Sequence, residues 1–202
     1  MTLPKTLLEM AGANPAPAPW SDTALVLIDC QNEYVEGPLR WTGVEAALAE
    51  AARLLAAARA AGAPVIHVRH QGKPGGAFAW DQPRGAICDA VAPADGETVV
   101  AKTLPNSFAG TPLEDAMKAT GRKHVIVCGF MTHMCVSATV RSALDHGFGA
   151  TVVANACATR DLPDGRAGVV TADDLHRAEL AALADRFCVV VPDATQIGGG
   201  GT

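Results

Sequence analysis

The chain has 202 residues, of which 49% are hydrophobic and 18% are charged, and its formal net charge is -5. This apolar content is enough to offset the entropy of ordering the chain, which excludes an intrinsically disordered protein. The acidic balance, with no run of Lys or Arg, excludes a surface built to bind nucleic acid or an anionic membrane.

The two ends of the chain lack the pattern of folded elements. Residues 1–21 are expected to form an N-terminal arm, extended where Pro and Ala dominate at 12–19. Glu9 interrupts its short apolar stretch, which is too weak for a secretory signal. The closing glycines predict a flexible tail over 196–202. We therefore expect one domain over 22–195, and, with no stretch able to span a bilayer, a cytoplasmic protein.

Between these ends, short β-branched runs alternate with Ala/Leu-rich segments of helical periodicity. Strands are expected at 24–29, 64–68, 98–101, 123–128, 150–154 and 187–191. Helices are expected at about 44–61, 111–120, 134–146 and 173–185. Near-continuous apolar strands separated by helices predict a parallel sheet covered on both faces. The expected fold is a single doubly wound α/β domain whose six parallel strands lie in the order 3-2-1-4-5-6.

In that order, ligands bind outside the carboxyl ends of the first and fourth strands. The first strand ends at Asp29, and the fourth leads through a glycine turn to Cys135 at the start of a helix. Helix N-termini favour a thiolate and offer backbone N–H groups to an oxyanion, so the layout resembles a nucleophile elbow. Asp29, raised in pKa by burial, could accept the thiol proton. From the residues alone, a buried structural Cys135 and a capping Asp29 are equally open.

Four segments, in this order, resemble the isochorismatase-like cysteine hydrolase superfamily over roughly residues 22–192. They are TALVLIDCQNEY, VVAKTLPNSFAGTPLEDAM, HVIVCGFMTHMCVSATVRSALDHGF and VVANACATRD. The resemblance implies a hydrolase fold of the class just described. It also implies a homo-oligomer, either a dimer or a tetramer, to which the apolar residues of the arm could contribute.

The same resemblance assigns roles to individual residues. It implies a catalytic triad of Asp29, Lys102 and Cys135, although a lone Lys after a short strand is usually a solvated charge. It implies a cis peptide bond between Phe130 and Met131. The backbone N–H groups of Met131 and Cys135 would form the oxyanion hole.

A metal site is not expected. His67 and His70 lie three apart on one strand, so their side chains point to opposite faces, and a structural or surface role is favoured for both. Nicotinamidases, one branch of the family, carry an Asp-x-His metal motif here, whereas this sequence reads Arg69-His70-Gln71. The glycines form no nucleotide-binding motif, so we expect no cofactor.

Aromatic residues in the loops after the first three strands predict a partly apolar substrate pocket, although such residues often serve packing alone. The expected pocket residues are Tyr34, Trp41, Phe78, Trp80, Phe108 and His133. Arg69, Arg84 or His133 could bind a substrate carboxylate, and the sequence does not choose among them. Gln31 and Asn32 are expected to fix the loop after Asp29.

Three hypotheses follow for the function of the protein, and in each of them its partner is a small molecule. The first is a cysteine hydrolase that cleaves the C–N bond of an amide, ureido or carbamoyl compound through a thioester acyl-enzyme. The second is an isochorismatase-type vinyl-ether hydrolase with Asp29 as general acid, which the elbow Cys135 disfavours because members of that type lack it. The third is a binding or redox-sensing module in which Cys135 is oxidised reversibly.

Overall fold

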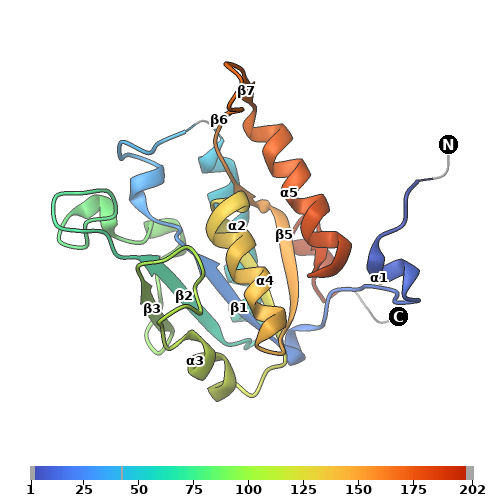
Figure 1. Cartoon of the computed structure of the whole chain (residues 1–202). Helices are drawn as coiled ribbons and strands as arrows, with labels where there is room; N and C mark the ends of the chain where they lie inside the picture. The colour runs from blue at the N-terminus through green and yellow to red at the C-terminus, as the bar shows by residue number, and fades with distance from the viewer. Residues whose placement is uncertain (1–2, 42, 199–202) are drawn as a thin grey trace.

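The protein is built around a six-stranded parallel sheet, which runs through the centre of Figure 1. The structure is a computed structural model that describes residues 3–41 and 43–198. The strands lie in the order β3-β2-β1-β4-β5-β8, which is 3-2-1-4-5-6 when these six are numbered along the chain. The predicted class and strand order are therefore confirmed. The strands are β1 (Thr23–Ile28), β2 (Val65–His70), β3 (Thr98–Lys102), β4 (His124–Phe130), β5 (Gly149–Ala158) and β8 (Val189–Val191).

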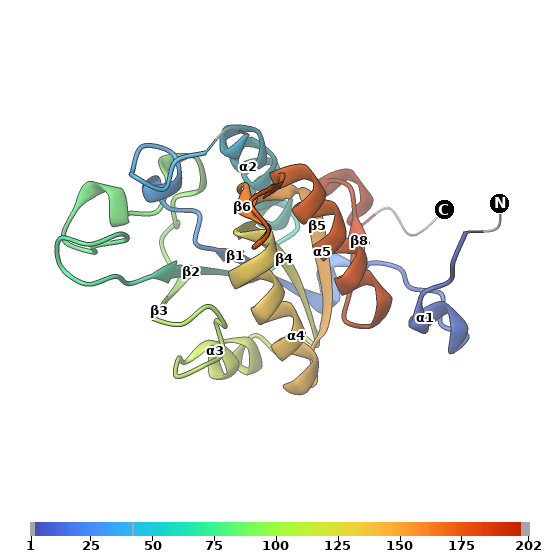
Figure 2. The same cartoon turned by 45° about the horizontal axis from the view of Figure 1, so that its top comes forward.

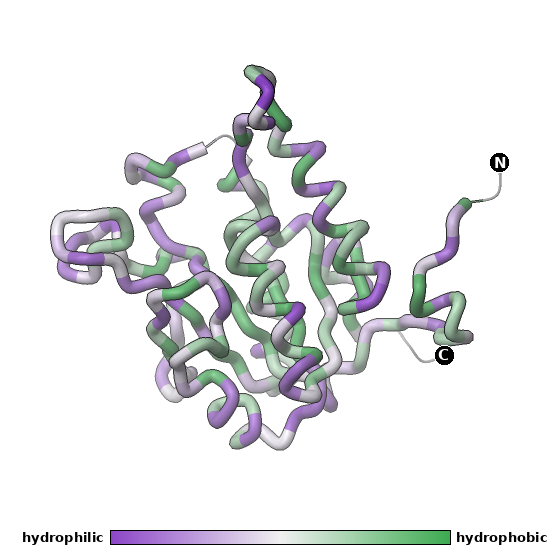
Figure 3. Tube along the Cα trace, in the orientation of Figure 1, coloured by the Kyte–Doolittle hydropathy of each residue, from purple (hydrophilic) through white to green (hydrophobic). Residues whose placement is uncertain are grey.

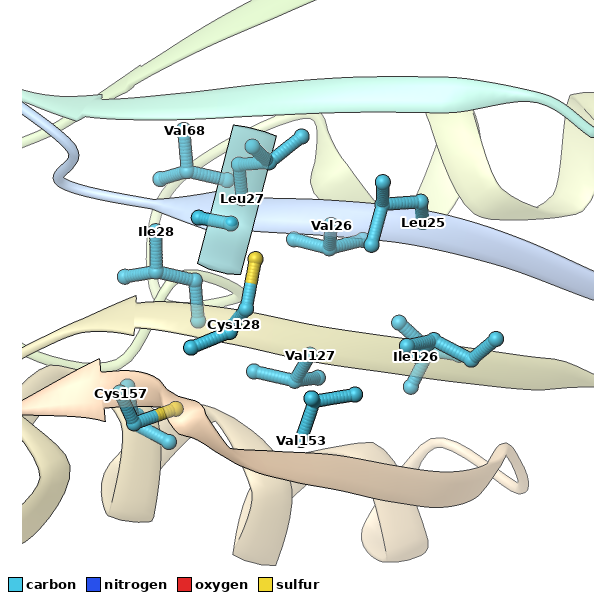
Figure 4. Packing of buried hydrophobic residues seen from close by; sticks show 14 of the residues in the cluster. Leu25, Val26, Leu27, Ile28, Val68, Ile126, Val127, Cys128, Val153 and Cys157 are labelled. Atoms are coloured by element: carbon cyan, nitrogen blue, oxygen red, sulfur yellow. The ribbon is translucent and has the colours of Figure 1, made fainter. Parts of the chain in front are cut away.

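The strands are runs of aliphatic and β-branched side chains, and this explains why they occupy the interior. Every residue of β1 is buried, and Figure 3 shows hydrophobic colours concentrated along the central strands. In Figure 4, side chains of β1, β4 and β5 pack together, with Cys128 and Cys157 among them. These two thiols are core residues.

Helices cover both faces of the sheet, with α2 on one face and α4 on the other (Figure 2). α5 packs against α4, and α3 lies near the end of α4, where Glu114 pairs with His146 at 3.1 Å. In α2 the buried residues recur every three or four positions, so its Ala/Leu-rich stripe faces the sheet. The helices are α1 (Leu7–Met10), α2 (Val44–Ala60), α3 (Leu113–Ala119), α4 (Ser137–Asp145) and α5 (Ala172–Arg186).

The connections hold short elements that the sequence did not reveal. An antiparallel pair, β6 (Leu162–Pro163) and β7 (Val169–Val170), joins β5 to α5. A π-helical turn at Thr132–Val136 precedes α4, so α4 starts three residues later than the expected helix at 134–146. Single 3₁₀ turns lie at Trp20–Asp22, Asn32–Tyr34, Pro83–Gly85, Asp89–Val91 and Ala194–Gln196.

The two ends of the chain differ in part from the expected arm and tail. The arm holds α1, whose first turn is closed by a reciprocal capping box between Thr6 and Glu9. Leu7 N–H donates to Asp185 Oδ1 at 2.8 Å, which ties α1 to α5. At the other end Ile197 is buried, so the core extends past the boundary placed at 195. Residues 199–202 of the expected tail lie outside the described residues.

Gly129 allows β4 to run two residues past its expected end at Cys128. The register of β4 against β5 shifts between Val127 and Gly129, which marks a bulge. Gly129 has a φ of +118°, and a Cβ atom there would lie 2.0 Å from the carbonyl oxygen of Ile28. Only glycine therefore fits where β4 passes β1 and leads into the turn that carries Cys135.

We predict that Gly129→Ala lowers the free energy of unfolding by about 3 kcal/mol, because the new methyl group meets backbone that cannot move aside. Gly96→Ala is the matched control, since Gly96 has a φ of +88° and open space around it. There only the positive φ opposes alanine, with a loss of about 1 kcal/mol. Urea denaturation measures both values, and equal losses would contradict the close approach of β4 to β1.

Candidate active site

Three buried side chains meet at the carboxyl end of the sheet. Asp29 follows β1, Lys102 ends β3, and Cys135 lies in the π-helical turn after β4. Lys102 Nζ donates to Asp29 Oδ2 at 2.7 Å and to Cys135 Sγ at 3.3 Å. The relative exposures are 0% for Asp29, 2% for Lys102 and 4% for Cys135. The structure thus brings the three residues of the expected triad into direct contact.

The backbone at Asp29 turns the carboxylate into the interior. Asp29 has a φ of +52°, a left-handed conformation that Asp tolerates better than most residues. Its N–H donates to Val68 O at 2.8 Å, and its own carbonyl accepts from Gln31 N–H at 2.8 Å. Carboxylate Oδ1 has no hydrogen-bond partner among the described residues. One carboxylate oxygen is therefore held by Lys102, while the other retains free lone pairs.

Gln31 locks the loop after Asp29 to the end of β2. Its carboxamide oxygen accepts from His70 N–H at 2.7 Å. Its amide nitrogen donates to the carbonyls of His70 at 3.0 Å and Gly85 at 2.8 Å. Asn32 Nδ2 donates to Pro83 O at 3.1 Å. Both side chains fix this loop, in agreement with the sequence expectation.

Burial decides the protonation of the site. It raises the pKa of Asp29, and Lys102 partly offsets the effect. Burial and the nearby Asp29 raise the pKa of Cys135 to about 12, again against the effect of Lys102. Burial and the nearby Asp29 thus oppose the thiolate that the start of a helix is expected to favour. The Lys102 ammonium balances one negative charge. When the thiol proton of Cys135 moves to Asp29, that charge moves from the carboxylate to the sulfur.

The turn around Cys135 is fixed by its own backbone and by two neighbouring elements. The peptide bond between Phe130 and Met131 is cis, as the family resemblance implies. Met131 O accepts from the N–H groups of Met134 at 3.0 Å and Val136 at 3.2 Å. Within the described part of the chain, Met131 N–H has no backbone acceptor. At the start of this turn, the Thr132 side chain is hydrogen-bonded to His176 of α5, and the His133 side chain to Thr159, directly after β5.

Three of the expected pocket residues lie together beside the triad. Tyr34 contacts the rings of Trp41, Phe78 and Phe130 edge-on, with centroids 4.5, 5.0 and 5.6 Å away. Burial raises the pKa of Tyr34, with smaller contributions from Asp29 and Cys135 that mark how near the ring is to them. We call Tyr34, Trp41, Phe78 and Phe130 the aromatic cluster.

The other expected pocket residues lie elsewhere or are only partly exposed. Phe108 stacks on His146 with centroids 4.6 Å apart, at the end of α4 opposite Cys135, so its placement in the pocket was wrong. The loop between β3 and α3 places Phe108 away from the carboxyl edge of the sheet. Trp80 is 59% exposed on its loop. His133 is half-buried, and burial and nearby Arg160 lower its pKa.

A cavity of about 580 Å³ adjoins the aromatic cluster, and Trp41 lines it together with Leu39, Arg160 and Thr171. Sequence reasoning did not single out Arg160. Of the arginines proposed for a carboxylate, Arg84 already donates to the carbonyls of Gly75 and Gly76 at 2.9 and 2.7 Å.

The sequence analysis favoured a structural or surface role for His70 and did not place it in the site, where its Nδ1 lies 3.4 Å from Lys102 Nζ. The parallel register that pairs His70 with Lys102 could have revealed it, but that register depends on the three-dimensional sheet. Its neighbour His67 has the predicted structural role, since Nε2 lies 2.9 Å from Glu97 Oε2.

Two larger features are absent from residues 3–41 and 43–198. No group of three or more His, Cys, Asp or Glu side chains is placed there to hold a metal ion. None of the helices in these ranges has the length and apolar content needed to cross a membrane.

We predict that Asp29→Asn lowers the free energy of unfolding by about 3–5 kcal/mol, because Lys102 then remains buried without a counter-charge. Adding Lys102→Met should recover part of this loss, which a double-mutant cycle in urea measures. Arg177→Met, which breaks an exposed pair with Asp174, is the control and should leave stability nearly unchanged. An Asp29→Asn variant as stable as the unmodified protein would show that buried Lys102 does not need the Asp29 carboxylate as its counter-charge.

Comparison with known proteins places this site in a family. The model of the isochorismatase domain matches residues 23–195. The secreted isochorismatase effector Isc1 of Verticillium dahliae is 38% identical over 184 residues, covering 90% of this chain and 94% of that protein. Maleamate amidohydrolase of Pseudomonas putida is 34% identical over 151 residues, covering 66% of this chain and 70% of that protein.

A crystal structure of an isochorismatase from Pseudomonas putida has a TM-score of 0.92 and 42% identity, and the match covers 96% of this chain and 100% of that one. One relative is named as secreted, so family membership does not assign a cellular compartment. The domain match spans most of the chain and includes β1, β3 and the turn after β4, which hold the three converging side chains. This chain therefore belongs to the isochorismatase family.

Proposed function

We propose that this protein is a cysteine hydrolase that cleaves the C–N bond of a small amide, ureido or carbamoyl compound through a thioester on Cys135. The observation that carries the proposal is the Lys102 ammonium, buried between Asp29 Oδ2 and Cys135 Sγ. This arrangement pairs a nucleophile with a base and a fixed positive charge. A relative named maleamate amidohydrolase supports an amide as the bond that is cleaved.

The first half of the reaction forms the acyl-enzyme. Asp29 takes the thiol proton on Oδ1, the oxygen without a hydrogen-bond partner among the described residues, and Cys135 Sγ attacks the carbonyl carbon. Negative charge passes from the carboxylate through sulfur to the carbonyl oxygen, while the Lys102 ammonium stays opposite it. The N–H groups of Met131 and Cys135 would receive that oxyanion. The C–N bond then breaks, and the proton on Asp29 moves to the departing nitrogen.

The second half of the reaction releases the acid. Asp29, now a carboxylate, takes a proton from water as the water oxygen attacks the thioester carbon. The C–S bond breaks, and the proton returns to the sulfur of Cys135. One water is consumed for each amide bond, and the site returns to its starting protonation without a cofactor.

The alternative functions fit the geometry less well. A redox-sensing thiol is a thiolate open to solvent, whereas Cys135 is buried and its pKa is raised to about 12. Vinyl-ether hydrolysis with Asp29 as general acid needs no thiol, so it leaves the contact between Lys102 and Cys135 without a purpose.

The substrate is proposed to be small and partly apolar, and the enzyme to work as a homo-oligomer. The aromatic cluster supports the apolar wall, because Phe78 of this cluster contacts the ring of His70, which lies beside Lys102. Leu3, Leu7 and Met10 of the arm are exposed, which supports their packing on a neighbouring subunit. Trp20, near the end of the arm, packs instead against the core of its own chain.

A panel of amides that includes maleamate, together with ureido acids and carbamoyl amino acids, tests the proposal by ammonia release. We predict that Cys135→Ala lowers kcat/KM by a factor of about 10⁴ or more, the scale seen when a nucleophile is removed. Cys188→Ala is the control, since Cys188 is also buried but lies directly before β8, outside the site. A folded Cys135→Ala variant with full turnover would contradict the nucleophile, and turnover of isochorismate by that variant would favour the vinyl-ether hydrolase.

A further inference from the structure

The Lys102 ammonium has three N–H donors, and three acceptors surround it. They are Asp29 Oδ2 at 2.7 Å, Cys135 Sγ at 3.3 Å and His70 Nδ1 at 3.4 Å. We propose that His70 is a positioning residue, whose neutral imidazole accepts one N–H of Lys102 and so directs the other two at Asp29 and Cys135. The proposal deepens the proposed function and rests on it, because it concerns the group that prepares the same nucleophile.

Hydrogen bonds to the backbone of His70 and a ring contact with its side chain hold the imidazole in place. His70 pairs with Lys102 in the parallel register of β2 and β3, which places the two side chains at the same edge. The backbone of His70 is fixed at both its N–H and its carbonyl by Gln31. The ring meets Phe78 at an angle of 60°, with centroids 5.2 Å apart. A side chain held in this way can fix the direction of a flexible lysine.

The charge state of His70 decides whether it can act in this way. The charged groups that face the ring are Lys102 on β3 and Asp29 after β1, with the Cys135 thiol beyond Lys102. Burial and Lys102 lower the pKa of His70, against a smaller effect of Asp29. The imidazole is therefore neutral at pH 7 and above, and Nδ1 accepts. As pH falls through its pKa, a protonated His70 would repel Lys102 and turn the ammonium away from Cys135.

Alkylation of Cys135 by iodoacetamide, followed by peptide mass mapping from pH 5 to pH 9, tests this without any substrate. His70→Asn keeps an acceptor near the position of Nδ1 but cannot titrate, whereas His70→Phe keeps a ring against Phe78 but has no acceptor. At pH 8 we expect His70→Asn to react at about the rate of the unmodified protein, and His70→Phe about tenfold more slowly, as for a lost hydrogen bond to a charged group. Cys135→Ala gives the background from the five other cysteines.

Toward low pH, the rate in the unmodified protein should fall more steeply than in His70→Asn. Asp29, whose pKa burial raises, titrates in both proteins, while His70 adds its protonation only in the first. Equal rates and pH profiles for all three proteins would overturn the inference. So would a His70→Asn variant as slow as His70→Phe, since an acceptor near the position of Nδ1 would then not be enough to direct Lys102.

The outcome separates this inference from the proposed function. If the labelling profiles follow expectation but no amide in the panel releases ammonia, the proposed function fails and the role of His70 in directing Lys102 stands. If ammonia is released with equal labelling in all variants, the role of His70 fails alone. With a working substrate, His70→Phe should lower kcat while leaving KM nearly unchanged, because His70 acts on the nucleophile and not on binding.

Discussion

The buried ion pair between Asp29 and Lys102 is the interaction on which the rest of the site depends. Neither charge is tolerated alone in a site with almost no access to water, so the two side chains must arrive together. They come from β1 and β3, which are separated by β2, and the carboxyl ends of these three parallel strands meet at one edge. The side chains that join these strands, Gln31 and His70, hold that edge in register. The strand order, the anchored loop and the electrostatics therefore all support the same ion pair, in which Lys102 Nζ lies 2.7 Å from Asp29 Oδ2.

The same pair sets the chemistry of the thiol. A free thiolate in this site would stand beside a carboxylate in a low dielectric, and this is why the pKa of Cys135 is raised. Passing the proton from Cys135 to Asp29 moves one negative charge without creating a second. The thiol can thus stay neutral until a carbonyl is present, and then ionise within the site. Exclusion of water, which opposes thiolate formation at rest, strengthens the interaction of Lys102 with the charge that develops during attack.

Apolar periodicity allowed the strands and helices to be predicted. The common strand order of a doubly wound sheet and the glycine turn after the fourth strand then placed Asp29 and Cys135 at the switch point. Lys102 could be assigned only through the family resemblance, because a lone lysine after a short strand is typical of a surface charge. The position of His70 beside Lys102 was not predicted. The alternation of side chains along β2 places His70 on the face opposite His67, but it does not say which of the two faces carries the Lys102 side chain. Phe108 was misplaced because the path of its loop depends on packing against the far end of α4. The thiol pKa depends on burial, which no local pattern reports.

The central claim is that an acyl group is transferred to Cys135 before water attacks it, and product partitioning tests this most directly. Substrates that share one acyl group but carry different leaving amines would be hydrolysed in the presence of hydroxylamine, and the ratio of hydroxamate to acid measured for each. A common thioester predicts the same ratio for every leaving amine, because the amine has departed before the products are decided. A ratio that changes with the leaving amine would contradict the account, since water would then attack the intact substrate.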